Sequence, residues 1–261
     1  MKLSKKSLLG TLTLSALVLG AYAPTALAAD EPVEVTAKSD AKVTFKEDDG
    51  ETTPPVNPGE PDPDPNPGEP DPEPGGGGSK GPLRVDYVSN LRFGEQKISG
   101  SSKEYHPTLV KWNFEDATSI YIPHFIQVTD NRGSNEGWTL SVERSEFATT
   151  ENEVLTGAEL VITNGEVVSI SDMPAETTPG VVQQTVTIPV GSAATVMTAA
   201  ENQGMATWSY SFGQPISNDA ASTDPTAVNN DVTLKVPGTA KKIADKEYTS
   251  NITWTLAAAE V

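Results

Sequence analysis

Short runs of alternating apolar and polar residues, separated by turn residues, dominate the chain from residue 80 onward and constrain its fold most. The alternation is clearest in Trp138–Val142 and Ile252–Leu256. A period of two places successive side chains on opposite faces of a β-strand, so each run predicts a strand with one apolar face. Turn signals such as Asn164-Gly165 fall between the runs, as in antiparallel sheets. Further runs of this kind are Val85–Tyr87, Tyr121–Val128, Val181–Val190 and Val232–Val236. We therefore predict a mainly β protein, with an antiparallel β-sandwich or barrel-like single domain over residues 80–261.

Two segments add to this picture. Residues Ser192–Asn202 are rich in Ala, begin at a Ser that can cap a helix and end before Gly204, which predicts one short helix. Residues Ala41–Phe45 alternate like a single strand, and a lone strand is not stable in water. We therefore predict that residues 29–52 form an N-terminal strand segment that pairs with the main domain.

Residues 53–79 are dominated by Pro, Gly and acidic residues. The unit Asn57–Pro63 is repeated as Asn66–Pro72, and residues 47–79 hold ten acids and no base. Frequent Pro disfavours helices and sheet ladders, and like charges repel one another. This composition predicts an acidic Pro/Gly-rich linker or a long Pro-rich loop that projects from the domain.

The first 28 residues resemble an export signal. Lys2, Lys5 and Lys6 precede the apolar run Leu8–Leu19, and Ala26–Ala28 offers a small-x-small cleavage site. This pattern predicts a signal peptide over residues 1–28 and a secreted protein. The alternative, a retained membrane helix, requires a longer apolar run. We expect no membrane insertion elsewhere in the chain.

Composition excludes several function classes. The chain has no Cys, which removes disulfide frameworks and thiolate zinc sites. A net charge of -18 argues against nucleic acid and anionic lipid as partners. The two His residues lie in no catalytic or metal-binding motif, so we expect no enzyme, no cofactor and no metal. The loop Asp130–Glu136 offers oxygen ligands for calcium, but it lacks EF-hand spacing, which favours a solvated turn.

Several segments, in matching order along the chain, resemble the WxL family of bacterial surface proteins. Besides the motifs Trp138-Thr139-Leu140 and Trp254-Thr255-Leu256, they include Lys42–Phe45, Asp86–Gly94, Gln127–Gly133, Gly204–Trp208 and Tyr248–Asn251. The resemblance covers nearly the whole mature chain. It implies a secreted protein that binds the peptidoglycan of Gram-positive bacteria non-covalently, alongside membrane-anchored surface proteins of the same cell.

The role of the motif residues stays open at this level. Trp138, Leu140, Trp254 and Leu256 are candidates for wall binding, because sugar rings lie well against the flat faces of aromatic side chains. Their period of two favours core positions, because Val142 continues one apolar stripe and Ile252 the other. The supporting candidates for the same site are Trp112, Trp208, Asn131 and Arg132.

Basic residues gather near both ends of the main domain. Arg84, Arg92, Lys97 and Lys103 form one group, and Lys241, Lys242 and Lys246 the other. Such groups are usually solvated, but together they would form a patch suited to the carboxylates of peptidoglycan stems. An alternative function is an adhesion or scaffold module that binds another cell-surface protein or a host matrix component.

Overall fold

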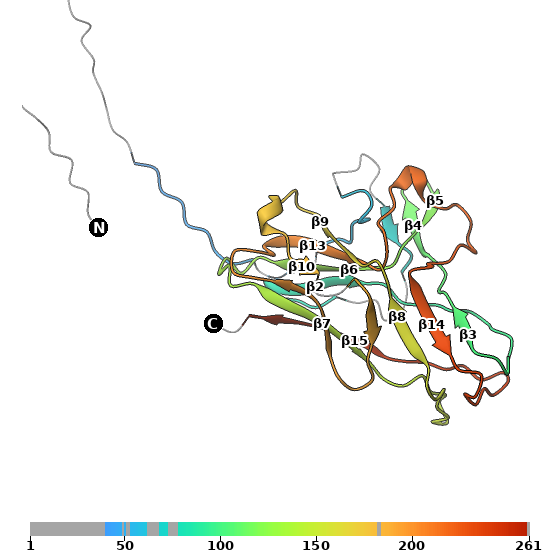
Figure 1. Cartoon of the computed structure of the whole chain (residues 1–261). Coiled ribbons are helices and arrows are strands. Elements are labelled where there is room, and N and C mark those ends of the chain that lie inside the picture. Colours follow the sequence, from blue (N-terminus) through green and yellow to red (C-terminus); the bar gives the residue numbers. More distant parts are fainter. Residues whose placement is uncertain are drawn as a thin grey trace, which may run out of the picture. The chain divides into compact units, whose positions relative to one another are not determined.

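The computed structural model describes residues 40–48, 50, 53–61, 68–72, 78–181 and 184–259. By its internal contacts the chain divides into two units, residues 1–44 and 45–261. All strands among the described residues belong to the second unit (Figure 1). The predicted signal peptide over residues 1–28, and large parts of the segments 29–52 and 53–79, lie outside the described residues.

The strands of the second unit form four sheets in which all paired strands are antiparallel. The β4 sheet has the order β1 (Gly68–Pro70), β4 (Val110–Phe114) and β5 (Ser119–Ile122). The β2 sheet has the order β2 (Leu83–Val88), β6 (Phe125–Asp130), β13 (Ala206–Ser211) and β9 (Glu166–Ser169). The β7 sheet has the order β10 (Gly180–Val181), β12 (Ala194–Ala199), β7 (Trp138–Arg144) and β15 (Ile252–Ala258). The β8 sheet has the order β11 (Val186–Ile188), β8 (Glu159–Ile162), β14 (Val232–Val236) and β3 (Lys103–Tyr105). Two 3-10 turns, η1 (Ala175–Thr177) and η2 (Asn218–Ala220), complete the regular structure.

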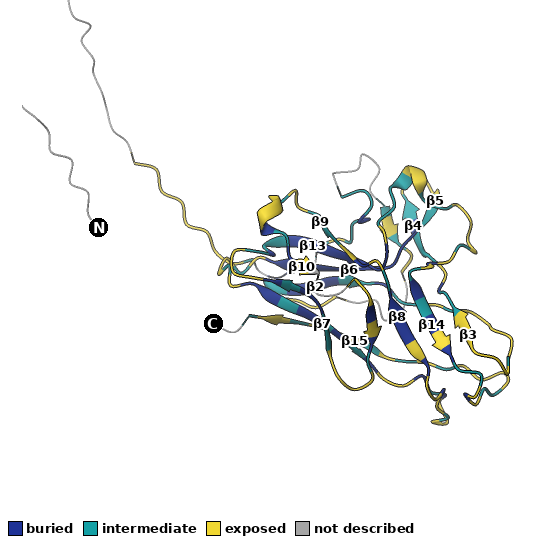
Figure 2. Ribbon diagram, viewed as in Figure 1, coloured by how far each residue is buried: buried dark blue, intermediate teal, exposed yellow. Residues whose placement is uncertain are grey.

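One apolar core joins the three four-stranded sheets. Val128 of the β2 sheet, Leu140 of the β7 sheet and Leu160 of the β8 sheet are fully buried members of the same cluster. Alternation explains their burial, since every second residue of β7 is buried and the others are half-exposed. Figure 2 shows buried stretches, in dark blue, along β6, β7, β8 and β14. The predicted mainly β, antiparallel architecture is confirmed, and the described strands form no closed barrel.

The predicted helix at Ser192–Asn202 is wrong. Residues Ala194–Ala199 form strand β12, and the described residues contain no α-helix. The Ala content suggested a helix, but Thr195, Val196 and Thr198 are β-branched and favour a pleated strand. β12 lies between β7 and β10 and bonds to both, so sheet pairing outweighs helix propensity. No described helix has the length and apolar character needed to cross a membrane.

The described part of the N-terminal segment, residues 40–48, contains no strand. Val43 is 75% exposed and Phe45 is 88% exposed. The pairing of residues 29–52 with the main domain therefore stays a prediction.

The described start of the Pro-rich segment packs against the β2 sheet and does not project. The backbone N–H of Thr53 donates to the Asp86 carboxylate at 2.8 Å, and that of Val56 donates to the Gln127 amide oxygen at 2.9 Å. Asn57 is buried and donates to the Asn218 side chain at 2.9 Å. An extended segment has unpaired N–H groups, and polar side chains on the outer face of the sheet accept from them.

The second copy of the repeat also contacts the domain. Gly68–Pro70 forms β1 and pairs with Trp112–Phe114 of β4. Sequence reasoning expected no ladder here, but β1 lies at the edge of its sheet, where Pro is tolerated. Gly68 is required at this position, because a Cβ atom there would lie 2.0 Å from the Trp112 indole nitrogen.

Candidate functional site

The two Trp-x-Leu motifs, 116 residues apart in sequence, lie on neighbouring strands. β15 pairs with β7 so that Leu256 faces Leu140, Ala258 faces Trp138 and Trp254 faces Val142. Because the strands are antiparallel and share this register, all four motif side chains point to the same face of the β7 sheet. The motifs therefore form one contiguous cluster.

This cluster faces the core. Trp138 is 1% exposed and Leu140 is fully buried, whereas Trp254 and Leu256 are half-buried at the edge of the sheet. The Trp254 ring stacks on Phe212 with 5.3 Å between ring centroids. Because they are buried, Trp138 and Leu140 are not available for direct contact with a wall polymer.

Two buried tryptophans hold one of these loops. The Trp138 indole N–H donates to the Gly204 carbonyl at 2.9 Å, and the Trp208 indole N–H donates to the Met205 carbonyl at 2.7 Å. Both tryptophans are 1% exposed. Buried indole N–H groups need an acceptor, and here consecutive carbonyls of the loop 200–205 provide it. This loop is thereby fixed between β12 and β13.

Close packing at this loop depends on glycine. Gly204 has a φ of +72°, and a Cβ atom there would lie 2.5 Å from both Trp138 Nε1 and Ala199 Cβ. Gly137 has a φ of +81°, and its Cβ would lie 2.2 Å from the Ala199 carbonyl oxygen. Only glycine meets both the positive φ and the close approach.

Arginines and carboxylates brace the facing loop, residues 131–137. Arg132 donates to both oxygens of Asp130, at 2.9 and 2.7 Å, and to the Gly137 carbonyl at 2.8 Å. This hydrogen bonding to Asp130 raises the pKa of Arg132 above its ordinary value. The loop is therefore held at both of its ends by one side chain.

A second ion-pair group lies beside it. Arg84 is 3% exposed and pairs with Asp86 at 2.9 Å and with Asp48 at 2.8 Å. Burial lowers the pKa of Arg84, but hydrogen bonds to Asp48 and Asp86 outweigh this effect and raise it overall. Asp48 also accepts from the Asn131 side chain at 3.2 Å, so this charge network extends to the loop.

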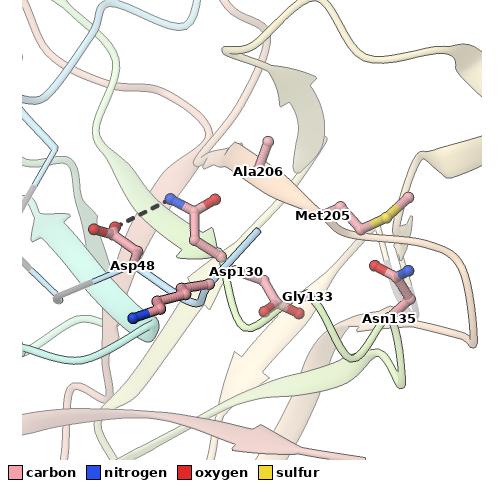
Figure 3. A pocket seen from close by; sticks show the side chains of 8 residues that line it. Asp48, Asp130, Gly133, Asn135, Met205 and Ala206 are labelled. Carbon is pink, nitrogen blue, oxygen red and sulfur yellow. Dashed lines mark hydrogen bonds between the residues drawn. The ribbon is translucent and has the colours of Figure 1, made fainter. Parts of the chain in front are cut away.

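Between the two loops lies a polar cleft of about 430 Å³. Figure 3 shows Asp48 on one side and Asn135 and Met205 on the other, with the hydrogen bond of Asp48 drawn as a dashed line. The remaining lining residues are Lys46, Asp130, Asn131, Gly133 and Ala206. Among the described residues the Asn135 side chain has no hydrogen-bond partner, so its amide is available to a ligand. The cleft thus presents amide and carboxylate groups between two loops that are held in place by hydrogen bonds.

The structure brings some of the predicted site residues together and separates others. Asn131 lines the cleft, Arg132 braces it, and Trp138 and Trp208 support its rim. Trp112 is 3% exposed and belongs to a separate small core with Ile122 and Phe125. It lies away from this cleft.

The predicted basic patch is reduced by ion pairing. Arg84 is buried, and Lys241 and Lys246 pair with Glu153 and Glu151. In the calcium-type loop the Asp130 carboxylate is bound by Arg132. The part of the chain that the structure describes contains no group of three or more His, Cys, Asp or Glu that could hold a metal ion.

Sequence reasoning missed Lys46, Asp48, Asn135 and Met205 as lining residues. Asn135 and Met205 lie in segments that carried a visible signal, since both adjoin the Trp138 and Trp208 motif segments. Asp48 carried none, because its role depends on a hydrogen bond to Asn131, 83 residues away.

Comparison with protein families gives one match. A family model described as WxL domain surface cell wall-binding matches residues 33–259. No curated protein and no solved structure matches the chain. The matched range includes the N-terminal segment, the Pro-rich segment and both Trp-x-Leu motifs.

Proposed function

Because the chain belongs to the WxL family of surface cell wall-binding domains, we propose that it is a secreted protein that binds peptidoglycan non-covalently. The host is a Gram-positive cell, and the protein is held at the wall without a covalent anchor. The family is one of binding domains and not of enzymes, so the proposed activity is adhesion to the wall without catalysis.

The polar cleft between the loops 131–137 and 200–205 is the proposed contact with the wall. The observation that carries this assignment is the pair of indole hydrogen bonds from Trp138 and Trp208 to Gly204 and Met205. These bonds fix one rim of the cleft, while Arg132 fixes the other. Loops that are already rigid lose less conformational entropy when a ligand binds. Trp138 and Trp208 therefore support recognition without touching the glycan.

The chemistry of the cleft suits acetamido sugars. Asn131 and Asn135 present side-chain amides, which can donate to and accept from hydroxyl and acetamido groups. The carboxylates of Asp48 and Asp130 are engaged by Arg84 and Arg132, so the cleft is not a site of free negative charge. A neutral, hydrogen-bonding glycan segment matches such a surface.

Co-sedimentation with purified sacculi tests this proposal. The mature chain from Ala29 is mixed with sacculi stripped of teichoic acid and protein, and the bound fraction is compared with an Asn131→Ala/Asn135→Ala double variant. Asn230→Ala, an exposed asparagine outside the cleft, is the matched control. We expect the double variant to lose binding and the control to keep it, with circular dichroism confirming that all variants fold.

Two outcomes would overturn the proposal at different levels. Equal binding by the double variant and the wild type would remove the cleft as the contact. Absence of binding by the wild type would remove wall binding itself.

A second candidate function rests on the edge of the β7 sheet. β15 pairs with β7 on one side only among the described residues, and Thr253, Thr255 and Ala257 are exposed along it. An edge strand with small side chains can accept an extended strand of a protein partner. A surface protein of the same cell is the proposed partner. Pull-down by a purified partner in the absence of sacculi would distinguish this function from wall binding.

A further inference from the structure

A groove on the outer face of the β2 sheet holds part of the Pro-rich segment. Gln127 of β6 points to this face, because its two neighbours in the strand belong to the core. The Gln127 side-chain amide donates to the Pro54 carbonyl at 3.1 Å and accepts from the Val56 N–H at 2.9 Å. Gln127 is fully buried. This side chain therefore binds the backbone of the segment as a neighbouring strand would.

The turn that follows, Asn57–Glu60, is bound through its side chains. Asn57 is 3% exposed, its amide donates to Asn218 Oδ1 at 2.9 Å, and its own Oδ1 atom accepts from the Gly59 N–H at 3.0 Å. The Glu60 carboxylate accepts from the Asn218 N–H at 3.3 Å. The Glu60 N–H donates to the Asn57 carbonyl at 2.9 Å, which closes the turn. The domain thus contacts both the Asn and the Glu of the turn.

The space around the turn requires a glycine at its third position. A Cβ atom at Gly59 would lie 1.8 Å from the Ile216 carbonyl oxygen and 2.1 Å from its carbonyl carbon. Both are backbone atoms, which cannot move aside as the end of a flexible side chain can. Pro58, at the second position, favours the turn conformation. The site therefore selects the sequence Asn-Pro-Gly-Glu. We name this site, formed by Gln127, Ile216 and Asn218, the turn groove.

The chain contains the matching sequence twice. Residues Asn57–Pro63 recur unchanged as Asn66–Pro72. The described part of the second copy, Gly68–Pro70, pairs with β4 and forms the three-residue edge strand β1. Because an edge strand of this length adds little stability, the second copy can be released at low cost. The described residues thus form one turn groove, whereas the sequence offers two segments that fit it.

The sheet face that binds the segment contains two buried hydroxyls without partners. Ser209 of β13 is the cross-strand neighbour of Gln127, and Ser211 lies two residues further on, so both point to the same face as Gln127. They are 0% and 1% exposed, and among the described residues neither hydroxyl has a hydrogen-bond partner. A buried polar group without a partner lowers stability. Removal of the segment exposes this face to water, so the unpaired hydroxyls favour exchange of the turn.

We propose that the turn groove also binds the Asn-Pro-Gly-Glu sequence of a second copy of this chain, in place of the molecule's own turn. The Pro-rich segment then links copies of the protein. Pro65 precedes the second repeat where Val56 precedes the first, and Pro has no N–H to donate to Gln127. The molecule's own turn also has the advantage of its tether, which corresponds to a local concentration in the millimolar range. Exchange between copies is therefore expected at high protein concentration.

Peptide binding tests the turn groove directly. Asn57→Ala/Asn66→Ala removes the Asn from both repeats and leaves the groove residues unchanged. A fluorescent peptide of sequence Asn-Pro-Gly-Glu-Pro-Asp-Pro is titrated with this double variant of the mature chain, and binding is followed by fluorescence anisotropy. We expect the peptide to bind the double variant at least about tenfold more tightly than the wild type, whose own turn competes for the groove. The inference does not depend on wall binding, so this test uses no sacculi.

Altered peptides and protein variants provide the controls. Replacing Asn by Ala in the peptide removes the bond to Asn218, and replacing Gly by Ala places a Cβ atom against the Ile216 backbone. Each altered peptide is expected to bind at least about tenfold more weakly. Asn218→Ala, added to the double variant, is expected to weaken binding similarly, whereas Asn230→Ala, an exposed asparagine outside the groove, leaves it unchanged. Circular dichroism confirms that each variant folds.

Analytical ultracentrifugation of the wild-type chain tests the link between copies. We expect association that increases as the protein approaches about millimolar concentration and that an excess of the peptide suppresses. Equal affinity of the three peptides, or no binding by the double variant, would remove the turn groove as a recognition site. Peptide binding without association of the chain, or association that the peptide does not affect, would overturn the linking of copies.

Discussion

Two glycines of the polar cleft provide a direct test of how Trp138 organises it. Gly204 and Gly133 have nearly the same backbone conformation, with φ of +72° and +73°. They differ in space, because a Cβ atom at Gly204 would lie 2.5 Å from Trp138 Nε1, whereas one at Gly133 would meet no atom within 4 Å. Gly204→Ala and Gly133→Ala therefore form a matched pair of substitutions.

The expected costs follow from the two terms separately. A left-handed backbone costs a non-Gly residue about 1–2 kcal/mol, and Ala regains about 0.4–1 kcal/mol by restricting the unfolded chain. Both terms are common to the two variants, so Gly133→Ala is expected to destabilise by about 1 kcal/mol. Overpacking against Trp138 and Ala199 adds about 1–3 kcal/mol for Gly204→Ala.

Equilibrium urea unfolding of the mature chain, followed by tryptophan fluorescence, measures both free energies of unfolding. Gly204→Ala is expected to lower the free energy of unfolding by at least about 1 kcal/mol more than Gly133→Ala does. Trp138→Phe removes the indole atoms at the point of contact, so its combination with Gly204→Ala is expected to be less damaging than the sum of the two. Equal losses for the two glycine variants, or full additivity in the double variant, would show that Trp138 does not hold the loop.

Three further predictions concern the core and the buried charges. Trp138→Phe leaves the Gly204 carbonyl without its hydrogen-bond donor. It is expected to destabilise the protein by about 1–3 kcal/mol more than Trp254→Phe, because no described residue accepts from the Trp254 indole. Urea unfolding of both variants measures the difference. Burial lowers the pKa of His124 from an ordinary 6.5 to about 3 in the folded protein. The unfolded chain therefore takes up a proton that the folded chain refuses, and stability falls as the pH is lowered from about 6.5 toward 3, by up to about 4–5 kcal/mol. Unfolding between pH 4.5 and 6.5 is expected to show a flatter slope in His124→Gln, and identical slopes would refute this. Asp86→Ala removes one of the two carboxylates paired with the buried Arg84 and is expected to cost about 1.5–3 kcal/mol. Thermal and urea unfolding measure this loss, and a loss below about 1 kcal/mol would contradict the pairing.

Strands with clear alternation could be predicted from the sequence. The run Val232–Val236 is β14, and Trp138–Val142 and Ile252–Leu256 lie within β7 and β15. The prediction of a single strand over Tyr121–Val128 was less accurate, because Pro123-His124 divides this run into β5 and β6, which belong to different sheets. A period of two identifies strands but carries no signal for the point at which a chain changes sheet.

The docking of the Pro-rich segment could not be predicted from its composition. Its prolines and acids suggest an isolated solvated loop, but its N–H groups are accepted by Asp86 and Gln127 of the β2 sheet. Nothing in the segment itself identifies those partners. Gly59 shows how closely it packs, since a Cβ atom there would lie 1.8 Å from the Ile216 carbonyl oxygen.

The pairing of the two Trp-x-Leu motifs explains why both are found in one domain. A slip of one residue between β7 and β15 would turn Trp254 and Leu256 from the core face to the solvent face. The register that places Leu256 opposite Leu140 is therefore the one in which both motifs bury their side chains. It also fixes the end of β7 from which Trp138 reaches Gly204. The motif thus specifies a sheet register and a rigid loop. Under the proposed function, recognition falls to residues outside the motif, Asn131 and Asn135 in the cleft, and substitutions at these two positions are expected to alter glycan binding while the motif and the fold stay the same.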